Sequence, residues 1–200
     1  MPASRRAAWG TISREQIVET ALDVVRAGHY EQLTIRGLAS QLGVAPMSLY
    51  RHVRDKDDLL DEVVDRLLAD VWKPRARPDD VRGFLTEASE RLRRFLVSQP
   101  AALRVVLRHP LTSPNAVARM EAMIDSLRQA GFTPRAARRA FATIQTYTIG
   151  FAALEASRER WVPRETTDAV ARQLSSFTTP RQFAVGLQCL LDGLEQRRET

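Results

Sequence analysis

The chain has 200 residues, of which 44% are hydrophobic and 27% are charged, so it is long enough to bury a core and has an ordinary globular composition. It has no run of 18 apolar residues, no secretory signal pattern and one cysteine, which argue against a membrane span or an internal disulfide and favour a cytoplasmic protein. The net charge is +6, and residues 1–56 hold eight basic and five acidic side chains. This local excess of positive charge can attract a polyanion or serve solubility alone, and charge does not decide between the two.

The N-terminal segment predicts short helices in succession. Ser13 and Gln16 have the spacing of a capping box, and the apolar residues that follow keep helical spacing until Gly28. Thr34 opens a second short helix that ends at Gly43. The hydroxyl of Thr34 and the amides after it could meet a phosphate.

A third helix begins at Pro46, buries Leu49 and ends near Val53. Asp55 caps a fourth, longer helix, and Lys56 adds positive charge beside the N-terminus of that helix. Two short helices joined by a glycine turn are typical of the helix-turn-helix, whose second helix enters the major groove of DNA.

The remaining side chains of the third helix suit such a groove. Met47 can pack on a thymine methyl, Ser48 can donate or accept, and Arg51 can address guanine or phosphate. Tyr50 and His52 can donate to backbone phosphates. Short helix pairs are common, however, and Tyr50 could instead be a half-buried core ring.

The rest of the chain also predicts helices, and no alternating strand pattern is present, so the fold class is all-α. The best candidate boundary is the polar, proline-bearing stretch "KPRARPDD". Beyond it we expect helices at 80–98, 100–108, 114–130, 134–159, 165–177 and 180–197. The expected division is a helix-turn-helix domain at 1–56, a linking helix at 57–72 and an effector-binding and dimerisation domain at 73–200.

The helices at 134–159 and 180–197 are apolar over more than one face. Such a helix lies either at the centre of a large monomer or between its own core and a second subunit, as in a four-helix interface. The residues expected at that interface are Ala140, Tyr147, Gly150, Leu154, Phe183, Leu187 and Leu191. Cys189 lies in the same apolar pattern and is expected to be a small buried side chain.

The stretch "LTIRGLASQLGVAPMSLYRHVRDKDDLLDEVVDRLL" resembles the N-terminal DNA-binding domain of the tetracycline-repressor (TetR) family. "QAGFTPRAARRAFATIQTYTIGFAALE" and "FAVGLQCLLDGLEQ" resemble the eighth and last helices of the C-terminal domain in the tetracycline-repressor subgroup. The resemblance is close over 12–72 and looser over 73–198. It implies a homodimeric repressor with a three-helix DNA reader and a ligand-binding helical body. It also implies that a small-molecule effector moves the fourth helices and separates the two readers.

The resemblance also assigns DNA-contacting positions. By match of motif, these are Thr34, Arg36, Pro46, Met47, Ser48, Tyr50, His52 and Lys56. Arg51 replaces a bulkier aromatic residue found in some tetracycline repressors, which bears on the operator sequence rather than on DNA binding. The implied partners are a palindromic double-stranded operator and an effector, with no membrane.

An effector pocket is expected among the fourth to eighth helices. The candidate lining residues have inward helical phase, although each could be ordinary core: Leu68, Trp72, Phe84, Ala88, Leu92, Phe95, Val106, His109, Met123, Leu127, Gln145 and Ile149. Tetracycline repressors hold their drug with polar side chains and a magnesium-bound histidine. At approximately those places this chain has Trp72, Ala88, Leu92, Val106 and Met123. We therefore expect no metal or other cofactor and a largely apolar effector, aromatic or planar.

Enzymatic motifs are missing from the sequence. There is no HExxH, CxxC or phosphate-binding glycine loop, and no Ser–His–Asp set can be assembled, so we do not expect an enzyme. The alternative function is a helical ligand-binding or adaptor protein without specific DNA affinity. Such a protein would bind DNA weakly and lose that binding by roughly 200 mM salt.

Overall fold

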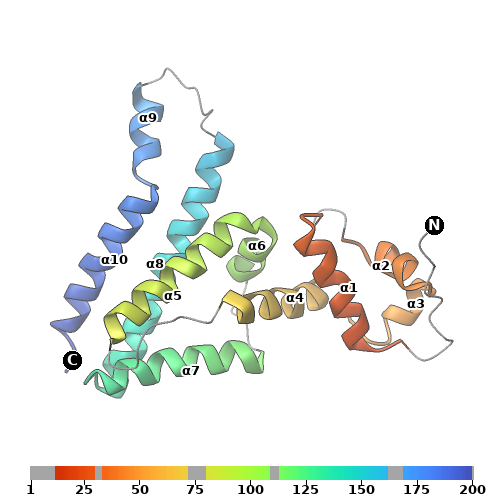
Figure 1. Ribbon diagram of the computed structural model, residues 1–200, viewed down its shortest axis with the longest axis horizontal. Coiled ribbons are helices and arrows are strands. Elements are labelled where there is room, and N and C mark those ends of the chain that lie inside the picture. The colour runs from red at the N-terminus through yellow and green to blue at the C-terminus, as the bar shows by residue number, and fades with distance from the viewer. Residues whose placement is uncertain (1–11, 30–32, 72–79, 109–112, 162–168, 200) are drawn as a thin grey trace. The chain divides into compact units, whose positions relative to one another are not determined.

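The computed structural model describes residues 12–29, 33–71, 80–108, 113–161 and 169–199, and throughout these ranges the regular structure is α-helix (Figure 1). The all-α prediction is confirmed. The helices are α1 (Arg14–Arg26), α2 (Ile35–Leu42), α3 (Pro46–Leu49), α4 (Lys56–Val71), α5 (Val81–Ser98), α6 (Pro100–Arg108), α7 (Pro114–Gln129), α8 (Pro134–Trp161), α9 (Ala169–Ser176) and α10 (Pro180–Glu195). None of the described helices is long and apolar enough to cross a membrane.

The chain forms two compact units, Met1–Leu67 and Leu68–Thr200. The predicted polar break at 73–80 lies outside the described residues except for Asp80. Its side chain accepts from the backbone N–H of Gly83 at 2.7 Å and so caps α5. An N-terminal cap of this kind satisfies a backbone donor that has no partner within the helix.

The first unit begins and ends its helices with the predicted local signals. Ser13 and Gln16 form a complete capping box at the start of α1. The Thr34 hydroxyl accepts from the Gly37 N–H at 3.0 Å at the start of α2. Gly43 ends α2 with a φ of 67°, a left-handed conformation that is easily reached only without a side chain.

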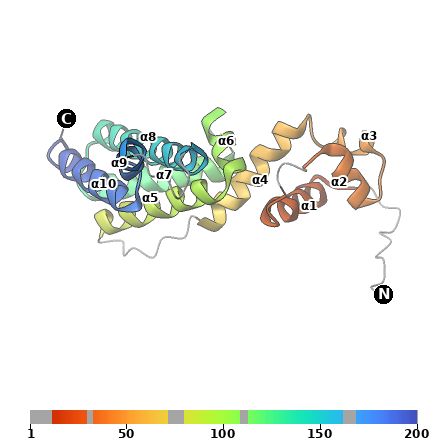
Figure 2. The same ribbon diagram turned by 90° about the horizontal axis from the view of Figure 1, so that it is seen from above.

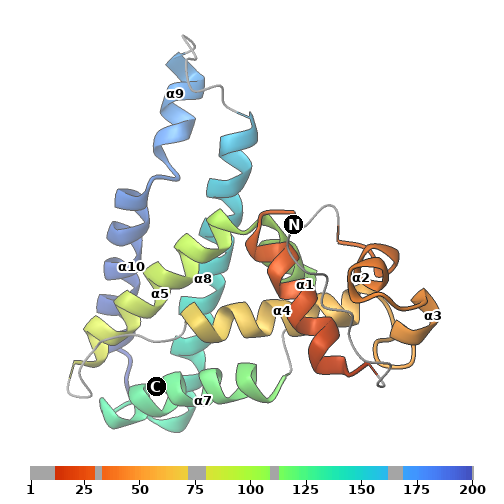
Figure 3. The ribbon, with the colours of Figure 1, turned by 45° about the vertical axis from the view of Figure 1, so that its right-hand side comes forward.

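Helix α3 is shorter than predicted. It covers a single turn that ends at Leu49, whereas the sequence pattern predicts an end near Val53. The reason is local, since the N–H groups of His52 and Val53 both bond to the Leu49 carbonyl and close a turn instead of extending the helix. Figure 3 shows α2 and α3 side by side, next to α1.

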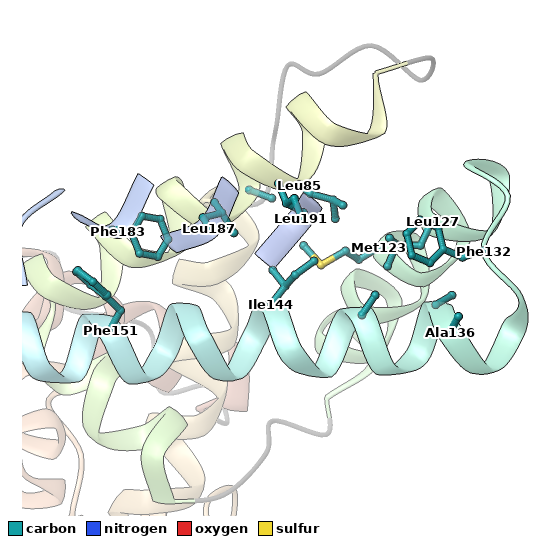
Figure 4. Close-up of a cluster of buried hydrophobic side chains, with 13 residues drawn as sticks. Leu85, Met123, Leu127, Phe132, Ala136, Ile144, Phe151, Phe183, Leu187 and Leu191 are labelled. Carbon is teal, nitrogen blue, oxygen red and sulfur yellow. The ribbon is translucent and has the colours of Figure 1, made fainter. Parts of the chain in front are cut away.

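In the second unit, α8 is the helix against which α5, α6, α7 and α10 pack (Figures 1 and 2). Its inward face belongs to one buried apolar cluster, which draws side chains from α5, α7, α8 and α10 (Figure 4). Helices α8 and α10 are also joined by the Tyr147 hydroxyl, which donates to the Phe183 carbonyl at 3.0 Å. A Cβ on Gly186 would collide with that hydroxyl, so a glycine permits the contact.

Candidate nucleic-acid interface

The surface around α3 is built from a buried leucine and exposed neighbours. Leu49 is fully buried, and it holds the short helix against the core of the first unit. Met47 is 70% exposed and Tyr50 is 49% exposed, while Ser48 between them is half-buried. Two large, partly apolar side chains facing outward suit contact with base edges and sugar.

The other predicted contact residues lie around this surface. Thr34, Arg36, Pro46 and Arg51 are exposed, and His52 and Lys56 are half-buried. Because the Thr34 oxygen already accepts the cap bond, its hydroxyl hydrogen can point outward toward a phosphate. Lys56 is the first residue of α4, where the helix dipole also favours an anion.

Arg14 ties this surface to α4. Its Nη1 donates to the backbone carbonyl of His52, three residues after the end of α3, and to Asp58 Oδ2 at 3.3 Å. Its Nε donates to Glu62 Oε2 at 2.8 Å. A guanidinium can hold three acceptors at once because its donors lie in a rigid fork. Arg14 thus joins α1, the residues following α3, and α4.

A second arginine fastens α1 along the next turns of α4. Arg66 donates to Glu15 through both terminal nitrogens at 2.7 Å, and to Glu19 at 2.6 Å. It also pairs with Glu62 at 3.2 Å on its own helix. The hydrogen bonds that Arg66 donates to Glu15 outweigh desolvation and raise the pKa of Arg66 above its ordinary value. Movement of α4 would therefore carry α1 with it.

The carboxylate of Asp58 is the acidic centre of the Arg14 contact. Burial disfavours its ionised form, but hydrogen bonds from the Arg54 backbone, Arg14 and the Arg54 side chain outweigh burial and lower its pKa below the ordinary value. The pKa of Arg14 is raised correspondingly, since its bonds to Asp58 and Glu62 outweigh its own desolvation. Sequence inspection did not predict the contacts of Arg14, because they join residues 38 to 48 positions apart.

The predicted effector residues do not enclose one described pocket. Buried members are Leu68, Ala88, Met123 and Leu127. Half-buried members are Phe84, Leu92, Phe95, Val106, Gln145 and Ile149. Trp72 and His109 lie outside the described residues. Ala88, Met123 and Leu127 pack in the apolar cluster of the second unit, as the core alternative anticipated.

A described cavity lies elsewhere in the second unit, between α5, α7 and α10. It has a volume of about 70 Å³ and shares only Leu127 with the predicted set. Ligand pockets for drug-sized molecules usually measure about 300–1,000 Å³, so this cavity is too small to hold one as it stands.

Sequence inspection did not predict that four polar side chains of the second unit are buried. The second unit buries the side chains of Ser89, Arg93, Thr148 and Glu155. Arg93 Nη1 bonds to Glu155 Oε2 at 2.6 Å. The available signal was a charge at the inward phase of α5, between the buried leucines Leu85 and Leu96.

The predicted dimer residues divide into two groups. The chain's own core takes up Ala140, Phe183, Leu187 and Leu191. Since these are at most 3% exposed, they offer a partner no surface, and the prediction is corrected for them. Leu154 is 62% exposed, Gly150 is exposed and Tyr147 is half-buried.

The orientation of α10 explains why the interface prediction fails for its buried residues. It turns the Phe183 stripe inward, which leaves Val185 and Cys189, four residues apart, on the outside. Val185 is 50% exposed, and Cys189 is exposed rather than buried as predicted.

Both units match described families. Residues 17–63 match the family described as "Bacterial regulatory proteins, tetR family", and residues 73–198 match "Tetracyclin repressor-like, C-terminal domain". The chain belongs to the TetR family. The recognition made from the sequence motifs is confirmed, and this TetR-family chain is a DNA-binding transcriptional regulator.

Named relatives and a solved structure agree with the family. An HTH-type transcriptional regulator of Saccharopolyspora erythraea is 33% identical over 82% of this chain and 69% of its own length. An HTH-type transcriptional repressor of Streptomyces coeruleorubidus is 30% identical over 92% of this chain and 78% of its own length. The Streptomyces coelicolor TetR family protein ActR, in complex with (S)-DNPA, superimposes with a TM-score of 0.74 at 25% identity, over 94% of this chain and 100% of ActR.

Proposed function

We propose that this regulator is a homodimeric repressor that leaves a palindromic operator when a small, largely apolar ligand binds its second unit. The observation that carries the proposal is the α3 surface, where Leu49 is fully buried while Met47 and Tyr50 project outward. A soluble adaptor without DNA affinity would have no need to expose these large side chains around a basic, helix-terminal edge.

The contacts with DNA divide by chemistry. Met47 meets the thymine methyl, and Ser48 and Arg51 address base edges, so these three residues set sequence preference. The neighbouring residues Tyr50 and His52 donate to phosphates, which positions the helix without reading sequence. Phosphates are also the partners of Thr34, Arg36 and Lys56, which border the groove. Pro46 has no N–H to donate, so it can contact the DNA only through its ring.

The dimer forms through the outer faces of α8 and α10. Leu154 and Val185 are large apolar side chains exposed in the single chain, and Gly150 and Cys189 supply small neighbours. Such an apolar face rimmed by polar residues favours a protein partner. A two-fold axis through it presents two copies of α3 to major grooves about 34–36 Å apart.

The ligand releases the repressor from its operator because it binds two states of the dimer with different affinities. The ligand binds more tightly to a state of the dimer in which the spacing of the two α3 helices is wrong for the operator. Arg14 and Arg66 fasten α1 to α4, so a shift of α4 moves the reading surface as one body. A coupling of about 1–3 kcal/mol would change operator affinity by roughly 5–150-fold. Support for a small organic ligand comes from ActR, whose structure contains (S)-DNPA.

The test is a gel shift with the DNA that flanks the gene for this chain, repeated at about 50 and 200 mM salt with a shuffled duplex as control. Specific binding would persist at the higher salt and map to a palindrome by footprinting. Equal binding to the shuffled duplex, lost by about 200 mM salt, would contradict the operator proposal and favour the adaptor.

A further inference from the structure

The apolar interior of the second unit contains an ion pair and two hydroxyl groups. Arg93 is 7% exposed and Glu155 is 5% exposed, and they bond at 2.6 Å between α5 and α8. Ser89 lies one turn before Arg93 on the same face of α5. Thr148 lies two turns before Glu155 on α8, and its hydroxyl donates to the Ile144 carbonyl at 2.8 Å.

Two buried polar atoms in this group lack partners among the described residues. They are Arg93 Nε and Ser89 Oγ. An unsatisfied buried donor costs about 1–3 kcal/mol, so native cores seldom keep one without a role. Because Ser89 and Arg93 share a face, one acceptor atom can lie between them.

Aromatic rings border the same place. The guanidinium carbon of Arg93 lies 5.2 Å from the centroid of the Phe183 ring. Phe151 meets Phe183 edge to face, with 5.2 Å between the ring centroids. Figure 4 shows these two rings directed toward one another from α8 and α10. A flat ring is thus already the neighbour that the guanidinium face accepts.

The charge balance selects the kind of ligand. Glu155 already neutralises Arg93, so an added carboxylate would bring an uncompensated charge into an apolar core, which is expensive. A carbonyl oxygen accepts the same hydrogen bonds without that cost. We propose that Arg93 and Ser89 anchor the effector of this regulator, and that the effector is a neutral, planar aromatic ketone.

In the bound state the ketone oxygen accepts from Arg93 Nε and Ser89 Oγ. In the structure the Phe183 ring fills the space over the guanidinium. When the ligand binds, its ring takes the position of the Phe183 ring. Since Phe183 belongs to α10, binding acts directly on a helix of the proposed dimer face. This inference rests on the ligand-released repression proposed above, and it names the chemistry of the ligand.

Matched probes test the anchor on the full-length wild-type chain. Equilibrium dialysis compares 9-fluorenone, fluorene, which lacks the ketone oxygen, and 9-fluorenone-4-carboxylate, which adds a charge. A hydrogen bond to a charged donor predicts that fluorenone binds about tenfold more tightly than fluorene. The carboxylate should bind more weakly than fluorenone.

Substitutions test whether Arg93 and Ser89 cause the preference for fluorenone over fluorene. The double variant Arg93→Met/Glu155→Gln removes both charges and leaves no lone buried ion. It should keep only the roughly two- to fivefold preference for fluorenone that Ser89 supplies, and Ser89→Ala should lose roughly two- to fivefold of the wild-type preference. The control is Arg91→Met/Glu87→Gln, which makes the same changes in a partly exposed pair at 2.6 Å on the same helix. The control should keep the wild-type preference.

Each contrary result overturns the anchor. These results are equal binding of fluorenone and fluorene by the wild type, no binding of either, tightest binding of the carboxylate, or an undiminished, about tenfold ketone preference in the double variant. If the double variant does not fold, as judged by circular dichroism, Ser89→Ala and the wild-type comparison decide the matter. The repressor proposal is tested separately, because another compound that releases operator DNA equally from wild type and Ser89→Ala would sustain it while refuting the anchor.

Discussion

Replacing Arg14 with methionine should loosen the first unit without altering its helices. Methionine keeps much of the apolar stem but removes the bonds to Glu62 at 2.8 Å, to Asp58 at 3.3 Å and to the His52 carbonyl. Because the Arg14 side chain is 41% exposed, each of its ion pairs should stabilise the first unit by only about 0.5 kcal/mol. With the backbone hydrogen bond, the expected loss is about 1.5 kcal/mol, or roughly a tenfold larger open population.

Hydrogen exchange on the full chain measures this loss where it occurs. Peptides from α1 and α4 should exchange about tenfold faster in Arg14→Met, while peptides from α8 remain unchanged. The control is Arg54→Met, which removes a bond to the same Asp58 from a side chain that is 84% exposed. That variant should change exchange by less than about twofold. Equal effects of the two substitutions would refute the idea that Arg14 clamps α1 and α3 to α4.

Three further predictions concern DNA contact, acid stability and assembly. Lys56→Ala should weaken all duplexes about equally and lower the salt slope by about one unit, whereas Met47→Ala should alter base preference at an unchanged slope; an unchanged slope in Lys56→Ala would remove its phosphate role. The folded-state pKa of Asp58 is below the ordinary 3.8, so its stabilisation is complete above that pH and is lost as pH falls through the lower value. Urea midpoints of wild type and Asp58→Asn should therefore converge toward acid, and parallel curves would contradict this. Gly150→Leu meets open space in the single chain, so it should spare the fold and weaken the dimer, and unaltered sedimentation at dilute concentration would count against that interface.

Helix boundaries followed from local chemistry. Ser13, Thr34 and Asp55 carry side-chain oxygens that accept from N–H groups three residues later, and Gly43 adopts a left-handed φ. These interactions involve neighbours in the chain, so they can be read from a few consecutive letters. The same local reasoning predicted that Met47 and Tyr50 are exposed, because a short helix that buries Leu49 turns these neighbours outward.

The burial and pairing of charged residues in the second unit could not be predicted from such local signals. Arg93 and Glu155 are 62 residues apart, and each looks like an ordinary surface charge within its own helix. Only the packing of α5 against α8 makes them partners in an apolar core. The predicted pocket residues were chosen by inward phase, and inward phase does not distinguish a cavity wall from a packed core.

The sequence alone determined the class of fold, the start of each capped helix and the family, because these depend on residues close together in the chain and on motifs of fixed spacing. Tertiary structure decided which apolar stripe of α10 faces the core. Phe183 and Val185 are two positions apart, so they lie on nearly opposite sides of one helix, and either could face the core. The packing partners on α5 and α8 select the Phe183 stripe and leave Val185 and Cys189 outside. A helix with two apolar faces has no internal preference between them, so its neighbours make the choice.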